Sequence, residues 1–238
     1  MDVWGLLFAL FVRTFLFQPF TASSGAMEPT LAPGDIFVGA KYAYGYSRFS
    51  ASLLPADRLP LGRLFALTPN RGDVVIFKLP RDNQTDYVKR VIGLPGDKVQ
   101  MIAGRLYING AMVEREAIAP YTIEGQLGKP VQAAHYIETL PGGASYEIVE
   151  IQGGKGFLAD TPLFETPPEH YFVMGDNRDN STDSRIAPEL GGVGYVPFEN
   201  LVGRAETVFF SVQKDAPALA FWRWPWTVRW DRLFRPAH

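Results

Sequence analysis

Three short segments of the sequence carry side chains that could take part in catalysis. The first is Ser23 to Leu31, which reads Ser-Ser-Gly-Ala-Met-Glu-Pro-Thr-Leu. Its small Ser and Gly residues let a backbone come close to a ligand, and Pro29 fixes the turn that follows. The second segment surrounds Lys89, and the third runs from Gly175 to Arg185. All three segments need a scaffold that brings them together.

Lys89 is a candidate general base. It lies in Tyr87 to Ile92, a mainly apolar run that predicts a strand. The alternation of a strand places Tyr87, Lys89 and Val91 on one face and the intervening residues on the other. A lysine accepts a proton only when it is neutral, so its reference pKa of about 10.4 must be lowered by apolar burial. A lysine on a strand is ordinarily solvated, and the residues alone leave both interpretations open.

The third segment, Gly-Asp-Asn-Arg-Asp-Asn-Ser-Thr-Asp-Ser-Arg, is rich in carboxylates and suggests a calcium site. An EF-hand loop that began at Asp176 or Asp179 would carry Ser where glycine is required. It would also carry Ala187 or Leu190 where glutamate is required. An EF-hand is therefore excluded, and the residues alone predict a polar loop with internal Asp–Arg pairs.

The composition excludes several other classes of function. The chain has 238 residues, no Cys, three His and a net charge of -2. It therefore cannot use a catalytic thiol, a disulfide or a thiolate metal site, and no HExxH-like motif predicts zinc. A slightly acidic chain does not predict binding to nucleic acid. We expect no metal, no cofactor and no nucleic-acid partner.

The elements that must position the three segments are mostly strands. Nineteen Pro, 23 Gly and 13% aromatic residues are typical of many short strands joined by turns. Asn109-Gly110, between two apolar runs, predicts a two-residue hairpin turn. We predict a mostly β, antiparallel core over residues 21–97 and 169–215, interrupted by a β-ribbon insertion over 98–168. Strands are predicted at 35–39, 74–77, 87–92, 106–108, 112–113, 170–174 and 201–212, and an irregular excursion at 41–70.

The two ends of the chain are apolar or aromatic. Val3 to Phe20 has one charge, Arg13. This apolar run predicts a transmembrane anchor over residues 1–20, whose helix is ended by Pro19. A buried soluble helix and a cleavable secretory signal are alternatives, although the signal would lack a positively charged beginning. The Trp- and Arg-rich stretch 216–238 suits either a membrane interface or packing against the β core.

Taken together, the three segments resemble those of bacterial type I signal peptidases. Ser23–Leu31 matches the family pattern Ser-Gly-Ser-Met-x-Pro-Thr-Leu, except that Ala26 stands at the nucleophilic serine. Tyr87–Asp97 resembles the general-base segment, and Gly175–Arg185 is similar to Gly-Asp-Asn-x-x-x-Ser-x-Asp-Ser-Arg. Residues 71–77 match a further family segment. Four segments in the family's order make the resemblance specific.

The resemblance implies a membrane-bound serine endopeptidase that cuts signal peptides from secreted preproteins after a small-x-small motif. Its partners would be preproteins and the lipid membrane. It would lie in the bacterial inner membrane with its catalytic domain on the periplasmic side. Because the Ala26 methyl cannot attack a carbonyl, we expect this chain to be an inactive Ser-to-Ala variant. A natural pseudoenzyme that binds signal peptides without cutting them is the alternative.

The resemblance also implies roles for individual residues. Lys89 would be the general base, paired with a nucleophile at position 26. Ser24 would hydrogen-bond the oxyanion, and Ser181 would orient the Lys89 amine. The residues expected to support the loop are Asp176, Asp183 and Arg185.

Overall fold

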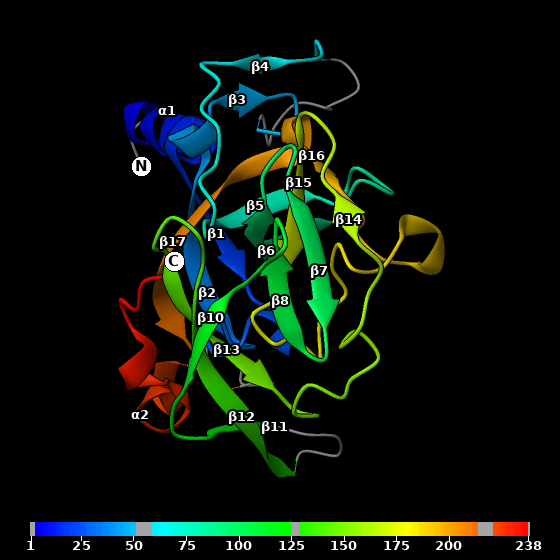
Figure 1. The fold of residues 1–238 in the computed structure, drawn as a ribbon. Coiled ribbons are helices and arrows are strands. Elements are labelled where there is room, and N and C mark those ends of the chain that lie inside the picture. Colours follow the sequence, from blue (N-terminus) through cyan, green and yellow to red (C-terminus); the bar gives the residue numbers. More distant parts are fainter. Residues whose placement is uncertain (1–2, 51–58, 125–128, 214–220, 238) are drawn as a thin grey trace.

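The computed structural model describes residues 3–50, 59–124, 129–213 and 221–237, and antiparallel β-strands dominate it (Figure 1). The predicted mostly β, antiparallel fold is confirmed. The largest sheet has seven strands, in the order β1, β2, β17, β5, β6, β15, β16. Their bounds are Phe17–Thr21 (β1), Asp35–Ala40 (β2), Leu201–Ser211 (β17), Val74–Lys78 (β5), Asp86–Gly93 (β6), His170–Met174 (β15) and Val196–Pro197 (β16).

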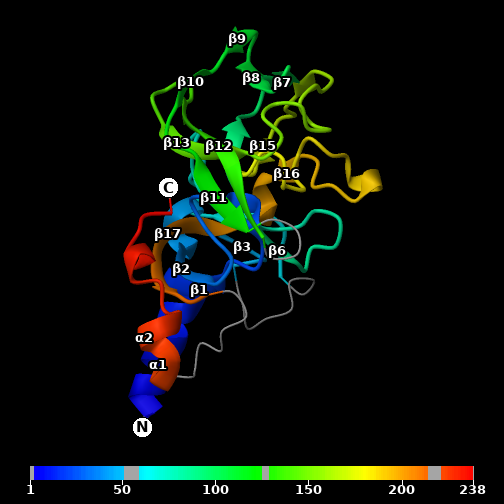
Figure 2. The same cartoon turned by 90° about the horizontal axis from the view of Figure 1, so that it is seen from below.

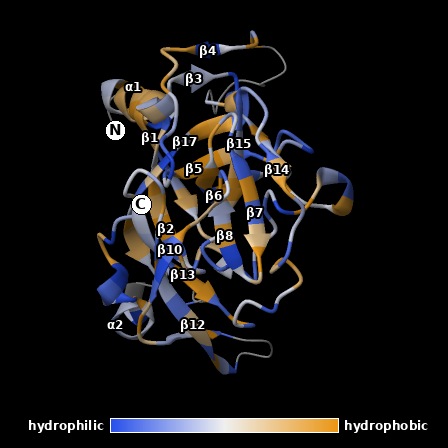
Figure 3. Ribbon diagram, in the orientation of Figure 1, coloured by the Kyte–Doolittle hydropathy of each residue, from blue (hydrophilic) through white to orange (hydrophobic). Residues whose placement is uncertain are grey.

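Both faces of the central part of this sheet are buried. The central strand β5 is hydrophobic over most of its length (Figure 3), and Val74 to Phe77 are at most 1% exposed. This burial explains the unbroken apolar run, because no residue of β5 before Lys78 needs to face water. One face packs with Met27, Phe37, Ile76 and Val208, and the other packs Val75, Phe77, Val173 and Leu201.

The described residues between 98 and 165 form two further four-stranded sheets. Asn109 and Gly110 have φ values of 52° and 81° between β8 and β9, so the predicted hairpin turn is confirmed. Buried residues of these strands share a hydrophobic cluster with Ile92, Phe172 and Met174 of the large sheet. One sheet contains β7 (Lys98–Ile102), β8 (Arg105–Ile108), β9 (Ala111–Met112) and β14 (Phe164–Glu165). The other contains β10 (Glu114–Ala117), β11 (Tyr121–Glu124), β12 (Pro130–Thr139) and β13 (Ser145–Glu150).

The region 41–70 is irregular, as predicted, although residues 51–58 lie outside the described residues. Its described residues contain one short antiparallel pair. The strands of this pair are β3 (Tyr46–Ser47) and β4 (Arg63–Leu64). Short 3-10 helices occur at Gly25–Met27, Lys41–Tyr44, Pro188–Leu190, Phe198–Asn200, Phe221–Arg223 and Trp230–Arg232.

The predicted transmembrane helix is wrong in its second part. Helix α1 spans Val3–Phe11 and continues as a π-helix only to Leu16, after which Phe17–Thr21 form β1. Pro19 does not end a helix; it lies in an edge strand opposite Val38, where the missing N–H is tolerated. Among the described residues, no helix is long and apolar enough to cross a membrane. An apolar run alone does not distinguish a helix from a helix followed by a strand.

The C-terminal tail packs on the core and also exposes aromatic rings. Residues 214–220 and 238 lie outside the described residues. The buried Asp35 carboxylate of β2 accepts hydrogen bonds from Arg229 and Arg232 at 2.6 to 3.1 Å. Trp226 and Trp230 remain 75% and 60% exposed. Helix α2, Trp224–Thr227, and helix α1 both lie away from β8 and β9 in the view of Figure 2, whereas Figure 1 shows α1 in the upper and α2 in the lower part of the molecule.

Candidate active site

A cavity of about 370 Å³, hereafter the site cavity, is lined by residues 20–24 and 85–89. These two stretches come from β1 and β6 and their neighbouring loops, and three strands separate β1 from β6 in the sheet. The sheet therefore curls so that both stretches face one space. Ala26, Ser24 and Lys89 all line this cavity, together with Asn180 and Thr182. Much of the remaining wall is apolar, from Phe20, Ala22, Met27, Phe37, Ile76 and Val88.

Lys89 is buried, with 4% of its surface exposed. Burial lowers the pKa of its amine to about 8, although Asp183 and Asp176 act in the opposite direction. Among the described residues it has no ion-pair partner, and its Nζ lies 5.7 Å from the centroid of the Tyr87 ring. A substantial fraction of the Lys89 amine is therefore neutral near pH 8, as a general base requires.

The two nearby carboxylates, Asp176 and Asp183, form ion pairs with arginines instead of with Lys89. Asp176 accepts bidentate hydrogen bonds from Arg90 at 2.8 and 2.7 Å. Asp183 accepts a second pair from Arg185 at 2.9 and 2.8 Å. Burial would raise the pKa of the Asp183 carboxyl, but Arg185, the backbone N–H of Gly175 and the Ser181 hydroxyl hold it below its usual value. Because both carboxylates are paired with arginines, burial remains the dominant influence on the pKa of Lys89.

Asp176 is the point at which the separate sequence segments meet. Its Oδ2 accepts a 2.6 Å hydrogen bond from Thr30, which belongs to the first segment. Arg90, next to Lys89 in β6, also donates to the carbonyl oxygen of Gly72 at 2.7 Å. The buried Thr30–Asp176–Arg90 group thus joins the stretch around Ala26, the strand that carries Lys89 and the 175–185 loop.

Gly175 lies against both Ala26 and Ser181. A Cβ atom added to Gly175 would stand 2.4 Å from the Ala26 carbonyl oxygen and 2.3 Å from Ser181 Oγ. Asn177 also contacts the stretch around Ala26, because its backbone N–H donates a hydrogen bond to the Ala26 carbonyl oxygen at 3.1 Å. Its side-chain amide donates to Gly25 O, also at 3.1 Å. The first and third sequence segments are therefore in direct backbone contact, with no space for a side chain at Gly175.

The two serines differ in their surroundings. Ser24 is exposed at the mouth of the site cavity, where a bound substrate would meet it. Ser181 is buried, and its Oγ helps to lower the pKa of the nearby Asp183 carboxyl, but no hydrogen bond of good geometry forms between them. A buried hydroxyl held this weakly calls for a further partner.

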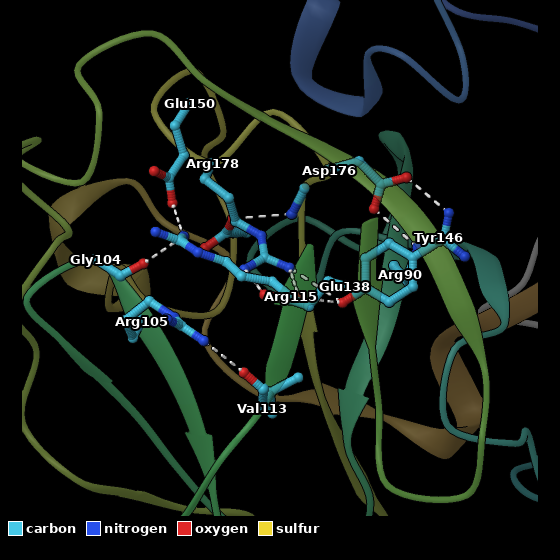
Figure 4. Close-up of polar contacts among 12 residues, drawn as sticks. Arg90, Gly104, Arg105, Val113, Arg115, Glu138, Tyr146, Glu150, Asp176 and Arg178 are labelled. Carbon is cyan, nitrogen blue, oxygen red and sulfur yellow. Dashed lines mark hydrogen bonds and ion pairs between the residues drawn. The ribbon is translucent and has the colours of Figure 1, made fainter. Parts of the chain in front are cut away.

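A buried ionic network beside the site was not predicted from the sequence. Glu138 of β12 accepts hydrogen bonds from Arg178 and, at 2.6 Å, from the Tyr146 hydroxyl of β13 (Figure 4). The Arg90 guanidinium lies 4.1 Å from the centroid of the same Tyr146 ring. Arg178 belongs to the 175–185 loop, so the network ties this loop to the strands of 98–165. Nothing local in the sequence pairs Glu138 with Arg178, forty residues away.

Strand β6 offers one open stretch beside the site cavity. It pairs with β5 along Asp86–Arg90 but with β15 only along Arg90–Gly93. In the described part of the chain, Asp86–Lys89 therefore have no neighbouring strand on the β15 side. Asp86–Lys89 therefore form an open edge beside the site cavity.

Comparison with known proteins identifies the family. Residues 3–210 match the family described as signal peptidase, peptidase S26. The signal peptidase I of Rickettsia typhi is 41% identical over 212 residues, covering 86% of this chain and 76% of that protein. The signal peptidase I of Rickettsia massiliae is 37% identical over 249 residues, covering 98% of this chain and 90% of its own length. The chain belongs to the signal peptidase family S26, which is a family of peptidases.

A solved structure also matches the chain over part of its length. It is the crystal structure of a signal peptidase I from Enterococcus faecalis, with 24% sequence identity and a TM-score of 0.32. The match covers 58% of this chain and 97% of the other.

Proposed function

We propose that this protein is a signal peptidase whose Ser/Lys dyad lacks its nucleophile because position 26 is Ala. The observation that carries the proposal is Lys89, which is buried in the same cavity as Ala26 and pairs with no carboxylate in the described part of the chain. A buried lysine with a lowered pKa contributes little to the fold, but it can act as the base that a hydroxyl nucleophile needs. The direct test is cleavage of a preprotein after Ala26→Ser.

In the proposed reaction, a serine hydroxyl at position 26 attacks the carbonyl carbon of the scissile peptide bond. The Lys89 amine takes the hydroxyl proton, and the oxyanion accepts hydrogen bonds from Ser24 and the backbone N–H of residue 26. The Lys89 ammonium then gives the proton to the leaving amine. The same base activates the water that releases the acyl group. Ser181 would orient the Lys89 amine, which would give its Oγ a further partner.

The substrate would lie in the site cavity as an extended strand. Its backbone would pair with the open stretch Asp86–Lys89, and its small side chains would contact apolar residues such as Ile76 and Val88. Asp176, Asp183 and Arg185 would support the loop, as their buried ion pairs suggest. The alternative function is a non-cleaving protein that binds signal peptides in the same cavity, and Ala26 is the observation that favours it.

Activity of the Ala26→Ser enzyme is expected to rise with pH. Because burial lowers the pKa of Lys89 to about 8, the fraction of neutral amine increases as pH rises through that value. The kcat/KM for preprotein cleavage in detergent should therefore reach half of its maximum near pH 8. A midpoint near the reference pKa of about 10.4 would contradict the assignment of Lys89 as the base.

We also propose that the protein works at a membrane surface through α1 and the exposed aromatic residues of the tail. Trp4 and Phe8 of α1 are 81% and 69% exposed. The double variant Trp226→Ser/Trp230→Ser should reduce partitioning of the full chain onto phospholipid vesicles by about ten-fold, because two interfacial rings are lost. Vesicle sedimentation measures this. Leu190→Ser, at a residue 81% exposed, is the matched control and should bind as the unchanged chain does. Equal binding by the double variant would remove the tail from the proposal.

A further inference from the structure

A second cavity lies on the far side of the loop that carries Ser181. This cavity, the loop cavity, has a volume of about 300 Å³. The 175–185 loop forms one wall with Arg178 to Thr182, and the stretch Gln152–Leu158 contributes Gln152, Phe157 and Leu158 to the other. Asn180 and Thr182 line both the loop cavity and the site cavity. The two cavities are therefore neighbours, separated by the short stretch 180–182.

Asn180 places this boundary beside the proposed point of cleavage. A Cβ atom added to Gly25 would lie 3.7 Å from the Asn180 side-chain nitrogen, and Gly25 precedes Ala26. Asn180 therefore lies close to the stretch that carries Ala26 and, at the same time, on the boundary between the two cavities.

The wall that contains Phe157 is held in place. The backbone N–H of Gln152 donates to Asp179 Oδ2 at 2.7 Å, which ties this stretch to the 175–185 loop. At Gly156, an added Cβ atom would come within 2.5 Å of Asp179 Oδ1, so the contact is close. Yet the Phe157 side chain on this anchored stretch is 92% exposed. A large apolar side chain fixed in water beside a cavity is typical of a binding surface.

The opposite wall offers polar atoms. Arg178 and Ser181 line the loop cavity, and Arg178 Nε and Ser181 Oγ are buried and form no hydrogen bond of good geometry among the described residues. Both residues are more than nine-tenths buried. A peptide has the complementary groups, because its carbonyl oxygens accept hydrogen bonds and its side chains can contact an apolar ring.

We propose that the loop cavity binds the first residues after the scissile bond, the beginning of the mature protein, and that Phe157 selects an apolar side chain among them. The proposal rests on the proposed function, because it takes the substrate to be a preprotein that crosses the site cavity. It assigns the stretch 152–158 a role in substrate selection. The signal peptide itself would occupy only the site cavity.

The test measures binding to the full chain, which retains Ala26 and would leave the peptide uncut. One labelled synthetic peptide is a signal peptide that ends at the residue before the scissile bond. A second continues for four residues that include a leucine, and a third replaces these four residues by aspartates. We expect the leucine-containing extension to bind about ten-fold more tightly than the truncated peptide, and the aspartate extension to bring no gain.

Phe157→Ala should abolish the gain from the leucine extension without changing the affinity for the truncated peptide. Phe157→Leu should keep most of the gain. Phe65→Ala is the matched control, since Phe65 is 82% exposed and follows β4, away from both cavities. Because Phe157 is almost fully exposed, its removal should leave the urea midpoint of unfolding unchanged.

The outcomes separate the two proposals. If the truncated peptide binds but the leucine extension brings no gain, or if the gain survives Phe157→Ala, the role of the loop cavity is overturned and the proposed function stands. If neither the truncated nor the extended peptide binds, both are overturned.

Discussion

Replacing Ala26 by Ser is expected to turn this chain into an active signal peptidase. Ala26 lines the site cavity beside Lys89, and its backbone carbonyl is fixed by Asn177. A serine hydroxyl would thus be added to a framework that already holds its base. Cleavage of a preprotein in detergent, followed on gels, should rise by at least about a thousand-fold over the chain as given.

The same enzyme should lose that activity when Lys89 is replaced by Ala. Removing a buried amine does not leave an unpaired charge, so the fold should persist while the base is lost. Lys98→Ala, at an exposed lysine of β7, is the matched control and should cleave normally. Absence of cleavage by Ala26→Ser, or undiminished cleavage after Lys89→Ala, would refute the dyad.

Replacing Glu138 by Ala is expected to reduce the free energy of unfolding by about 3–5 kcal/mol. The carboxylate is 1% exposed and accepts hydrogen bonds from Arg178 and Tyr146, which are also buried. Without it, the Arg178 guanidinium is left charged and without its ion-pair partner in the interior. Urea denaturation monitored by tryptophan fluorescence gives the loss.

The control for Glu138 is Glu147, on the neighbouring strand β13. Its side chain is 39% exposed and pairs with His135 and Arg235, so Glu147→Ala should cost less than about 1 kcal/mol. A double variant, Glu138→Ala with Arg178→Met, should recover part of the stability because no unpaired charge remains. Similar losses for Glu138→Ala and Glu147→Ala would show that the network contributes little to stability.

The sequence by itself determined the family segments and most strands of the large sheet. Runs such as Val74–Phe77 and Tyr171–Met174 are apolar because they are buried on both faces, and the Asn109-Gly110 turn depends on residues that accept positive φ. These are local properties, readable from a few adjacent residues. The same kind of local signal gave a wrong prediction at Phe17–Thr21. These residues form a strand instead of a helix because they pair with β2, which lies further along the chain.

Only the tertiary structure decided which distant residues meet. Thr30 reaches Asp176 across 146 positions, and Arg90 reaches it across 86. The partners of Glu138 and the cavity beside Phe157 likewise depend on how the strands of 98–165 pack against the 175–185 loop. Burial of Lys89 belongs to the same class, because a strand lysine is buried or solvated according to what covers it. Such contacts follow from the curl of the sheet and from side chains that pair only after folding, so no pattern of neighbouring residues specifies them.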